Sequence, residues 1–564
     1  MRVYEALNTV WNEYISPGQM FEVNTIDVGG APTRNFVHAP PSLREFWLST
    51  AQHGEREYLV YLQERTSYAQ AQQYTASLAS WLQKQGVQPG DRVAIAMRNY
   101  PEWMLAYWAI TSMGAVIVGM NAWWIPKEMH YALSDSKPKV LICDRERLER
   151  FREIQQDFPE MVVVGVRLQE ETPADVFAWQ DIINTAGELP EVAIDSDSDA
   201  CIFYTSGTTG KPKGAQLTHR GCVANVMNLA FINSVQPIAL ARSKDEEPPI
   251  PNPEEQLCAL VATPLFHVTA NNCVAQLTTM VGGKLVHMYK WDAAEALRII
   301  EEEQVTSFSA VPMMSREMLL HPDFSTRDTS SLTSIGGGGA ALQPDLVAKL
   351  EEGTENARAS TGYGMTETCG IIAAVSADFF VDKPASVGRA MPTFEAKVVD
   401  ANGNTLPTGE RGELLVRGAP VIKGYLNRPE AIVDGWLETG DVAYIDEDGF
   451  IFLVDRLKDM VLRGGENVYC SEVENALFSH EAVSECVVFA VPDDRLGEEV
   501  GAAIHLKDGA EATTEQLREH CRTLLSPYKI PRYIWIVAQP LPRNANGKFV
   551  KRELREALDM ADAR

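Results

Sequence analysis

The strongest local signal in the sequence is Tyr204-Thr205-Ser206-Gly207-Thr208-Thr209-Gly210-Lys211-Pro212-Lys213-Gly214. The apolar run ACIFYT precedes this signal and overlaps its first two residues, and the run AQLT follows it. Its three glycines let backbone N–H groups turn toward one point, an arrangement that cradles an anion. Four neighbouring hydroxyls and two lysines add donors for phosphate oxygens. It is not a Walker A loop, because no Gly-Lys pair precedes Ser or Thr. A bare turn of this composition would fit an exposed hairpin equally well, but the full string favours phosphate binding.

The composition is that of an acidic, folded protein. Lys and Arg number 50 against 77 Asp and Glu among 564 residues, so the formal net charge is −27, while apolar residues make up 45%. This apolar share supports several buried cores, and the acidic balance argues against nucleic-acid binding because the surface repels phosphates. The nine cysteines form no C-x-x-C pair and the ten histidines no H-E-x-x-H motif. We therefore predict a cytoplasmic protein without a disulfide framework or a His/Cys metal cage.

Short apolar runs alternate with helical patterns in the first part of the chain. This alternation predicts α/β layers with mostly parallel sheets. The strands are expected at 92–97, 115–120, 139–143 and 161–166, and the helices at 67–86 and 344–353.

Two long uncharged stretches fit a protein core better than a membrane. Residues 103–126 contain polar interruptions and are predicted to form a buried helix that turns at Gly114 into a strand. Residues 257–283 are broken by Pro264 and by Asn271-Asn272. We predict no transmembrane segment and no signal peptide, and peripheral membrane contact stays open. The charged, proline-rich segment 241–256 is predicted to be a surface loop.

The pattern changes near Lys397 to short strands joined by Asn-Gly and Thr-Gly turns, typical of a β-rich unit over about 395–455. After this unit a compact tail has apolar runs of its own, and Ser471 and Glu474 have the spacing of a capping box that opens a helix. The predicted fold is α/β, with two α/β-layered subdomains and the β-rich unit in a large N-terminal domain, 1–455. A hinge at 456–458 and a small mobile α+β C-terminal domain, 459–564, follow.

Five ordered motifs resemble those of the adenylate-forming (ANL) superfamily, and in particular its acyl-CoA synthetases. The first is the Thr/Gly loop, and the order and spacing agree over roughly residues 40–555. The other four are Ser360-Thr361-Gly362-Tyr363-Gly364-Met365-Thr366-Glu367-Thr368, Trp436-Leu437-Glu438-Thr439-Gly440-Asp441, Asp455-Arg456-Leu457-Lys458-Asp459 with Gly464-Gly465-Glu466-Asn467-Val468-Tyr469, and Pro542-Arg543-Asn544-Ala545-Asn546-Gly547-Lys548.

The resemblance implies ATP, Mg²⁺ and coenzyme A as reactants or cofactors. A carboxylate would attack the α-phosphate of ATP, and a thiol would then displace AMP. Cations must neutralise the two anions that meet in the first step. In the implied nucleotide site, the loop from Thr205 to Lys211 binds the phosphates, with Thr208 and Thr209 on the β- and γ-phosphates. Thr366 would lie near the α-phosphate, and Glu367 would bind Mg²⁺. Gly339, Gly362 and Tyr363 would surround adenine, and Asp441 and Arg456 would bind the ribose.

The tail supplies the remaining implied roles. Lys548 would stabilise charge between the carboxylate and the α-phosphate, and Gly464 and Gly465 would guide the thiol of coenzyme A. Lys458 would be the hinge about which the small domain swings between the two steps. Taken singly, Thr366 would be a helix cap, Asp441 a turn residue and Lys548 a solvated lysine; their order within the motifs favours function. Seven cations within or beside the motifs suggest a positive cleft: Lys211, Lys213, Arg456, Lys458, Arg463, Arg543 and Lys548.

The acid that enters the reaction is less well defined. His267, in Pro-Leu-Phe-His-Val, matches a motif near the acyl pocket of the family, although a lone histidine in an apolar stretch is often a core residue. Ile335-Gly336-Gly337-Gly338-Gly339 removes side-chain volume, so a roomy slot for a medium- or long-chain fatty acid is expected, and a bulky aryl or polycyclic acid remains an alternative.

Other functions of the same fold also stay open. They are loading of a carrier protein, luciferase-like oxidation and a nucleotide sensor without chemistry. The resemblance leaves the oligomeric state undecided, with a homodimer as one option.

Overall fold

The computed structural model describes residues 2–168, 172–205, 212–249, 252, 254–338, 347, 349–350, 353–354, 356–428, 432–464, 466–543, 549–559 and 563. The chain folds into two compact units, Met1–Glu395 with Val416–Leu437, and Ala396–Leu415 with Glu438–Arg564. The predicted hinge at 456–458 lies inside the second unit, so its role as a domain boundary stays a prediction.

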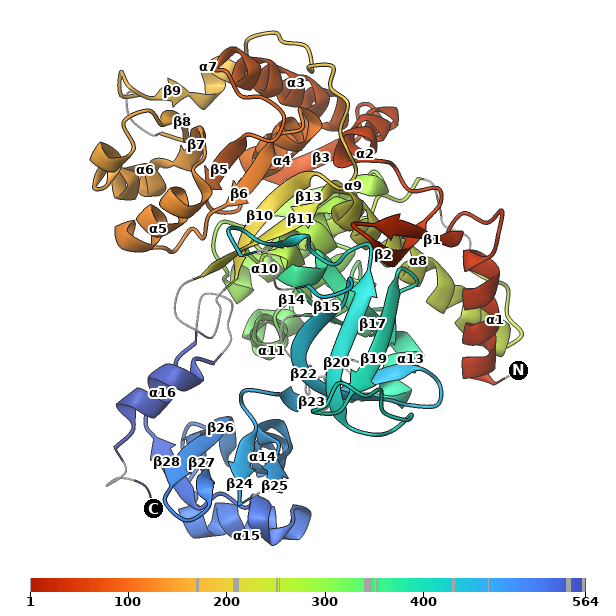
Figure 1. Ribbon diagram of the computed structural model, residues 1–564, viewed down its shortest axis with the longest axis vertical. Coiled ribbons are helices and arrows are strands. Elements are labelled where there is room, and N and C mark those ends of the chain that lie inside the picture. The colour runs from red at the N-terminus through yellow and green to blue at the C-terminus, as the bar shows by residue number, and fades with distance from the viewer. Residues whose placement is uncertain are drawn as a thin grey trace. The chain divides into compact units, whose positions relative to one another are not determined.

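An eight-stranded sheet forms the first layer of the first unit (Figure 1). Its centre is parallel, as predicted, whereas β10–β11 and β11–β21 are antiparallel pairs. The strands, in spatial order, are β21 (Gly424–Tyr425), β11 (Lys213–Thr218), β10 (Asp199–Thr205), β6 (Val116–Gly119), β5 (Arg92–Ala96), β7 (Val140–Asp144), β8 (Val162–Val166) and β9 (Phe177–Ala178).

The helices beside this sheet follow from the sequence pattern. The stretch predicted to turn at Gly114 does so, with φ +75°, between the wholly buried α4 (Pro101–Ser112) and β6. A helix that is apolar all round must be enclosed, and α4 packs against α2 (Leu43–Ser49) and α3 (Tyr68–Lys84). The others are α5 (Pro126–Ser136), α6 (Arg145–Arg152), with α6 packed on β7 and β8, and α7 (Trp179–Ile183).

A second sheet of the first unit has a parallel centre and antiparallel edges. The β3–β4, β16–β17 and β17–β18 pairs are antiparallel. In spatial order the strands are β18 (Ser386–Ala390), β17 (Gly370–Ser376), β16 (Arg358–Met365), β15 (Ser334–Gly337), β14 (Ser307–Ala310), β12 (Cys258–Val261), β13 (Lys284–His287), β3 (Glu57–Tyr61) and β4 (Glu64–Ser67).

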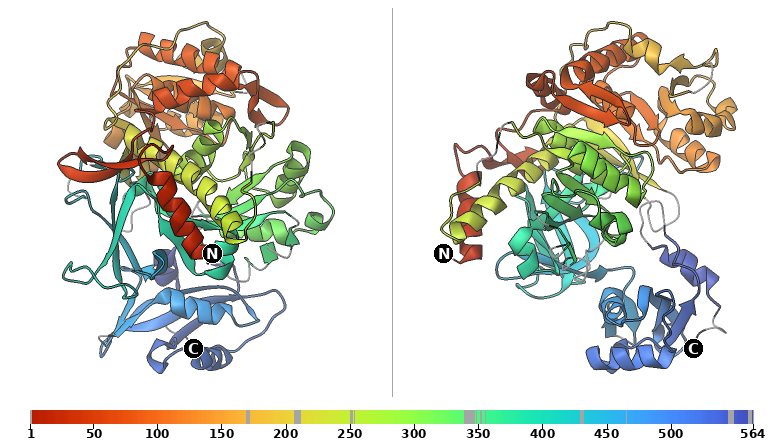
Figure 2. Two further views of the ribbon diagram at one scale, coloured as in Figure 1. Left: turned by 90° about the vertical axis from the view of Figure 1, so that its right-hand side faces the viewer. Right: turned by 180° about the vertical axis from the view of Figure 1, so that it is seen from behind.

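The remaining elements of the first unit include one long helix, α8 (His219–Ser243). It is the one described helix that is long and apolar enough to cross a membrane, but 67% of its apolar window is buried inside the protein, as in a core helix. It packs against α1 (Val3–Ile15), as both views in Figure 2 show. The others are the β1–β2 hairpin (Val23–Val28, Ala31–Phe36), the π-helix η3 (Thr269–Ala275), α9 (Gln276–Met280), α10 (Ala293–Glu303), α11 (Pro312–Leu320) and α13 (Ala377–Asp382).

The surface loop predicted at 241–256 is partly wrong. Helix α8 continues through Ala241, which is buried, to Ser243, so the helix absorbs the first three residues. The helix predicted at 344–353 lies largely outside the described residues.

The second unit contains a group of neighbouring strands and, after them along the chain, a small α+β fold built on a five-stranded sheet. Strands β19 (Phe394–Val399), β20 (Gly412–Gly418), β22 (Leu437–Ile445) and β23 (Phe450–Arg456) follow one another, as the predicted turns require. A five-stranded sheet contains β24 (Val461–Arg463), β25 (Glu466–Val468), β26 (Val483–Asp493), β27 (Gly497–Leu506) and β28 (Tyr533–Val537). Helices α14 (Cys470–Phe478) and α15 (Thr514–Leu524) share a buried core with it, and α16 (Lys551–Ala557) follows.

The predicted capping box of α14 is wrong. The N-cap is Tyr469, and the Ser471 hydroxyl donates to the Val454 carbonyl rather than to the helix. The Glu474 carboxylate accepts from the Val488 N–H at 2.8 Å and pairs with Lys551 at 3.2 Å. Tertiary partners have therefore replaced the local cap that the spacing suggested.

Candidate functional site

The two strands that flank the Thr/Gly loop form as the sequence predicts. Thr205 ends β10 and lies opposite Lys213 at the start of β11, so antiparallel pairing holds the two residues that flank the loop side by side. The Thr205 hydroxyl lies 3.5 Å from the Lys213 carbonyl oxygen. The loop residues predicted to bind phosphate, Ser206 to Lys211, lie outside the described residues.

The second motif lies on β16 and the short helix after it. Gly362 and Tyr363 are within β16, and Tyr363 is buried. A bulge between Tyr363 and Gly364 brings the Gly370 carbonyl so close that a Cβ on residue 364 would lie 1.7 Å from its oxygen. Only glycine fits there. Thr366 and Glu367 begin the 3₁₀ helix η5 (Thr366–Thr368), whose N-cap is Met365, so the capping role considered for Thr366 is wrong.

The Glu367 carboxylate has a defined partner. The Tyr425 hydroxyl donates to Glu367 Oε1 at 2.6 Å, and the Ile422 N–H donates to the Glu367 carbonyl at 3.0 Å. Burial, followed by the charge of Glu367, raises the pKa of Tyr425 well above its usual range, so the phenol remains a donor. Because β21 pairs with β11, this contact brings the second motif beside the strand that leaves the Thr/Gly loop.

His267 is half-buried at the entrance to an unusual helix. Its ring centroid lies 4.7 Å from that of Phe266, and its carbonyl accepts from the Asn271 N–H at 3.0 Å. The π-helix η3 follows, and π-helices often occur at functional sites. Its Asn271 and Asn272 side chains are buried and bonded to each other at 2.7 Å, so the polar pair predicted to break a membrane span is part of a core network.

The run of glycines from Gly336 to Gly339 begins within β15, and its described members have different surroundings. A Cβ at Gly336 would lie 2.6 Å from Ser360 Oγ, so this glycine permits close strand packing rather than opening a slot. Among the described residues, a Cβ at Gly338 would meet the Gly362 carbonyl oxygen at 3.7 Å and Thr269 Cγ2 at 4.0 Å. Gly339 lies outside the described residues. Both distances are ordinary van der Waals contacts, so the roomy slot that the sequence suggested stays a prediction.

In the second unit, the structure brings Asp441 and Arg456 together. They are directly opposite each other in the antiparallel β22–β23 pair, with Arg456 Nε 2.6 Å from Asp441 Oδ1. Asp441 is buried whereas the Arg456 side chain is 51% exposed. The preceding Gly440 has φ +69°, and its N–H donates to Glu413 Oε1 at 3.2 Å. Asp441 is therefore a strand residue rather than a turn residue, and the pair with Arg456 orients its carboxylate.

The predicted hinge and thiol-guiding residues lie further along the same unit. Lys458 is exposed in the turn after β23, where the Asp459 and Met460 N–H groups both donate to the Arg456 carbonyl. Gly464 has φ +60° in the β24–β25 turn, and its N–H donates to the Leu496 carbonyl at 2.8 Å. Gly465 lies outside the described residues.

The lysine motif is closed at its base. Arg543 and Phe549 form an antiparallel bridge, and the Val550 N–H donates to the Pro542 carbonyl at 3.0 Å. Lys548 itself lies outside the described residues. Three residues later the Lys551 ammonium donates to the Val488 carbonyl at 2.9 Å and pairs with Glu474.

Three of the cations expected to make a positive cleft already have acidic partners. Besides the Arg456–Asp441 pair, Arg463 pairs with the buried Glu499 at 2.8 Å and Arg543 with Glu485 at 2.9 Å. Their charge is largely compensated locally, so sequence adjacency overstated the positive potential.

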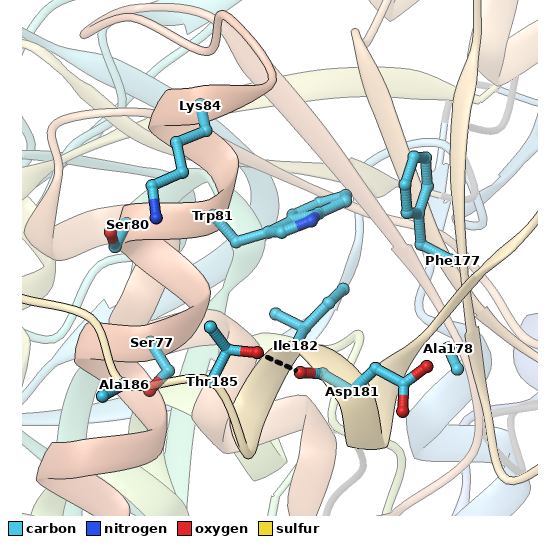
Figure 3. Close-up of a pocket in the computed structure, with 10 residues that line it drawn as sticks. All are labelled: Ser77, Ser80, Trp81, Lys84, Phe177, Ala178, Asp181, Ile182, Thr185 and Ala186. Atoms are coloured by element: carbon cyan, nitrogen blue, oxygen red, sulfur yellow. Dashed lines mark hydrogen bonds between the residues drawn. The ribbon is translucent and has the colours of Figure 1, made fainter.

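A surface pocket elsewhere in the first unit, between α3 and β9–α7, contains no motif residue. Its lining includes Trp81 and Phe177, drawn as neighbours in Figure 3. Their rings pack edge to face, with centroids 5.1 Å apart. Within the described part of the chain, no group of three or more His, Cys, Asp or Glu side chains could hold a metal ion. A divalent ion at the predicted nucleotide site would therefore be held by the Glu367 carboxylate together with oxygens of the bound nucleotide.

Comparison with protein families decides the identity of these motifs. Residues 46–426 match the AMP-binding enzyme family, and residues 472–548 match the AMP-binding enzyme C-terminal domain. The chain belongs to the AMP-binding enzyme family. The resemblance to adenylate-forming enzymes and the predicted fold class are thereby confirmed.

The relatives of this AMP-binding enzyme are ligases. It is 34% identical over 496 residues to a feruloyl-CoA synthase from Amycolatopsis sp, covering 87% of this chain and 93% of the relative. It is 33% identical over 512 residues to a long-chain-fatty-acid–CoA ligase from Bacillus subtilis, covering 85% and 88%. The solved structure of o-succinylbenzoate CoA synthetase from Bacillus subtilis, in complex with an acyl-adenylate intermediate, has a TM-score of 0.76 at 28% identity, covering 93% and 99%. The protein is an AMP-forming acid–thiol ligase.

Sequence reasoning missed one residue of the AMP-binding enzyme. Tyr425 contacts the second motif but lies 58 positions away in the sequence, in Lys423-Gly424-Tyr425. The only signal was an aromatic residue in a short strand-like run after the β-rich unit began, and nothing local connects it to Glu367.

Proposed function

We propose that the protein is an ATP-dependent acyl-CoA synthetase for a hydrophobic carboxylic acid, most suitably a medium- or long-chain fatty acid. The acid attacks the α-phosphate of ATP to give an acyl-adenylate and pyrophosphate. Coenzyme A then displaces AMP and forms the thioester. The single observation that carries this proposal is the adjacency of the Thr/Gly strand pair and Glu367 through β21.

Each half of the nucleotide has candidate contacts. The backbone and hydroxyls of the Thr/Gly loop would hold the β- and γ-phosphates, and Thr366 would lie near the α-phosphate. Tyr363, with Gly362 and Gly339, would enclose adenine. The Asp441 carboxylate would accept hydrogen bonds from the ribose hydroxyls, and its ion pair with Arg456 supports this role because it fixes the orientation of the acceptor.

The residues present fit a magnesium ion. Glu367 offers carboxylate oxygens, the hard ligands that Mg²⁺ prefers, and one of them already accepts from Tyr425. When bound, Mg²⁺ neutralises charge on the phosphate oxygens. The protein's part is to orient the Glu367 carboxylate and the phosphates so that the α-phosphate is open to attack.

Two residues of the second unit complete the cycle in this proposal. Lys548 would place its ammonium between the acid and the α-phosphate, where negative charge redistributes during attack. A swing about Lys458 would then exchange this lysine for the Gly464–Gly465 turn, which would guide the thiol. Lys458 is exposed in a turn between two strands, a place where a hinge can form, and this supports the assignment.

A bulky aryl acid is the second candidate substrate. The 34% identity to a feruloyl-CoA synthase favours it. Loading of a carrier protein remains a further alternative for the second step. We propose the cytoplasm as the location, where ATP and coenzyme A are available.

One assay separates these candidates. Purified enzyme is supplied with ATP, Mg²⁺ and a panel of acids from acetate to long-chain fatty acids and ring-bearing acids, and AMP release is measured with and without coenzyme A. Acid-dependent exchange of pyrophosphate into ATP establishes the first step, and consumption of coenzyme A distinguishes a CoA ligase from a carrier loader. A strong preference for acetate would contradict the proposed slot.

A further inference from the structure

Tyr425 is fixed to the sheet edge next to the Thr/Gly loop. Its strand β21 pairs with β11 in the register Ala215 to Tyr425, and the Leu426 N–H donates to the Gly214 carbonyl at 2.7 Å. The Leu426 side chain is buried in the core of the eight-stranded sheet. The backbone of Tyr425 therefore follows any movement of the strand that leaves the loop.

The tyrosine side chain connects that strand to the catalytic carboxylate. One end of it, the hydroxyl, donates to Glu367 Oε1 at 2.6 Å. The ring lies under the Lys213 ammonium, 5.0 Å from Nζ to the centroid. Lys213 is the residue paired with Thr205 at the base of the loop, so a single side chain touches both flanks of the site.

The side chain of a glutamate at the start of a short 3₁₀ helix can rotate, and this rotation weakens metal binding unless a hydrogen bond holds the carboxylate. Hydrogen bonds from a second layer of residues fix ligand orientation, and their loss typically weakens metal affinity about 10- to 100-fold. The Tyr425 bond occupies Oε1 and leaves Oε2 for another partner.

We propose that Tyr425 is a positioning residue: its hydroxyl holds the Glu367 carboxylate for Mg²⁺·ATP and couples that carboxylate to the Thr/Gly loop. This inference rests on the proposed function, because it assigns the metal to Glu367. In this role Tyr425 acts through Glu367 rather than by binding substrate or metal itself.

The test uses Tyr425→Phe, which keeps the ring beside Lys213 and removes only the hydroxyl. We expect the Mg²⁺ concentration for half-maximal pyrophosphate exchange to rise about 10- to 100-fold, with the rate at saturating Mg²⁺ close to that of the wild type. Calorimetry, independent of turnover, should show weaker binding of Mg²⁺·ATP but unchanged binding of ATP in the presence of a chelator. In a Glu367→Gln background the added effect of Tyr425→Phe should disappear.

Tyr131→Phe is the matched control. The Tyr131 hydroxyl donates at 3.1 Å to the carbonyl of Pro212, the residue that directly follows the loop. It should leave the Mg²⁺ dependence unchanged. If Tyr425→Phe lowers the melting temperature and the maximal rate without changing the Mg²⁺ dependence, its role is structural and the inference is overturned. If the wild type shows no acid-dependent exchange at all, the proposed function fails instead.

Discussion

His219 makes the first unit sensitive to acid. It is the first residue of α8, is fully buried, and accepts the Leu43 N–H on Nδ1 at 3.2 Å. Burial lowers its pKa to about 4, because a charged imidazolium there would lose its hydration without a compensating carboxylate. The unfolded chain, with an ordinary histidine pKa near 6.5, takes up the proton much earlier.

The sign and size of the effect follow from proton linkage. Because the native pKa is depressed, stability is complete above the unfolded pKa and is lost as the pH falls toward the native value. Between pH 8 and pH 5 the unfolded state gains about 2 kcal/mol from this one residue. His287, also buried, has its pKa lowered to about 3 and contributes a similar loss, so only the difference between variants isolates His219.

The perturbation is His219→Asn, whose amide oxygen can take the place of Nδ1 as the acceptor for Leu43. The smaller side chain costs about 1–3 kcal/mol of packing at any pH. Urea unfolding at pH 8 and pH 5, followed by tryptophan fluorescence, should show a pH-dependent loss about 2 kcal/mol smaller in the variant than in the wild type. His38→Asn is the control, because the His38 side chain is 52% exposed. Equal pH-dependent losses of stability in the wild type and in His219→Asn would show that the pKa of His219 is not depressed in the folded protein.

Three further predictions concern the second unit. Lys548→Ala should abolish acyl-adenylate formation while largely sparing thioester formation from a supplied adenylate. Equal loss of both half-reactions, assayed separately, would show that Lys548 does not act in the first step alone. Lys458→Pro should restrict the hinge and slow thioester formation more than adenylate formation, and single-turnover rates of both steps check this. Burial raises the pKa of Asp455 to about 6, despite attraction by Lys551, so stability present below pH 4 declines as the pH rises through 6. Asp455→Asn should therefore raise the unfolding free energy at pH 7.5 by about 1–2 kcal/mol but not at pH 4, and a urea titration showing no such gain would contradict the assignment.

Much of the fold was predictable because its determinants are local. The stretch from Trp103 to Gly119 shows why: continuous apolar character requires enclosure, and Gly114 permits the left-handed turn between helix and strand. The same holds for the strand pair at the Thr/Gly loop, where Thr205 and Lys213 are few residues apart. Where a local preference competed with tertiary partners it lost, as at Ser471 and Glu474, whose side chains bond to Val454, Val488 and Lys551 instead of capping their helix.

The enzyme class was readable from sequence alone, since five ordered motifs within short segments resemble those of the family. The same motifs single out Glu367, Asp441 and Arg456 as candidates, and their roles stay predictions. Only the tertiary structure decided which of them are partners. It put Arg456 opposite Asp441 across a strand pair and brought Tyr425 to Glu367 across 58 positions of sequence. Hydrogen bonds act over about 3 Å, and which distant side chains come within that reach depends on strand pairing that no single segment encodes.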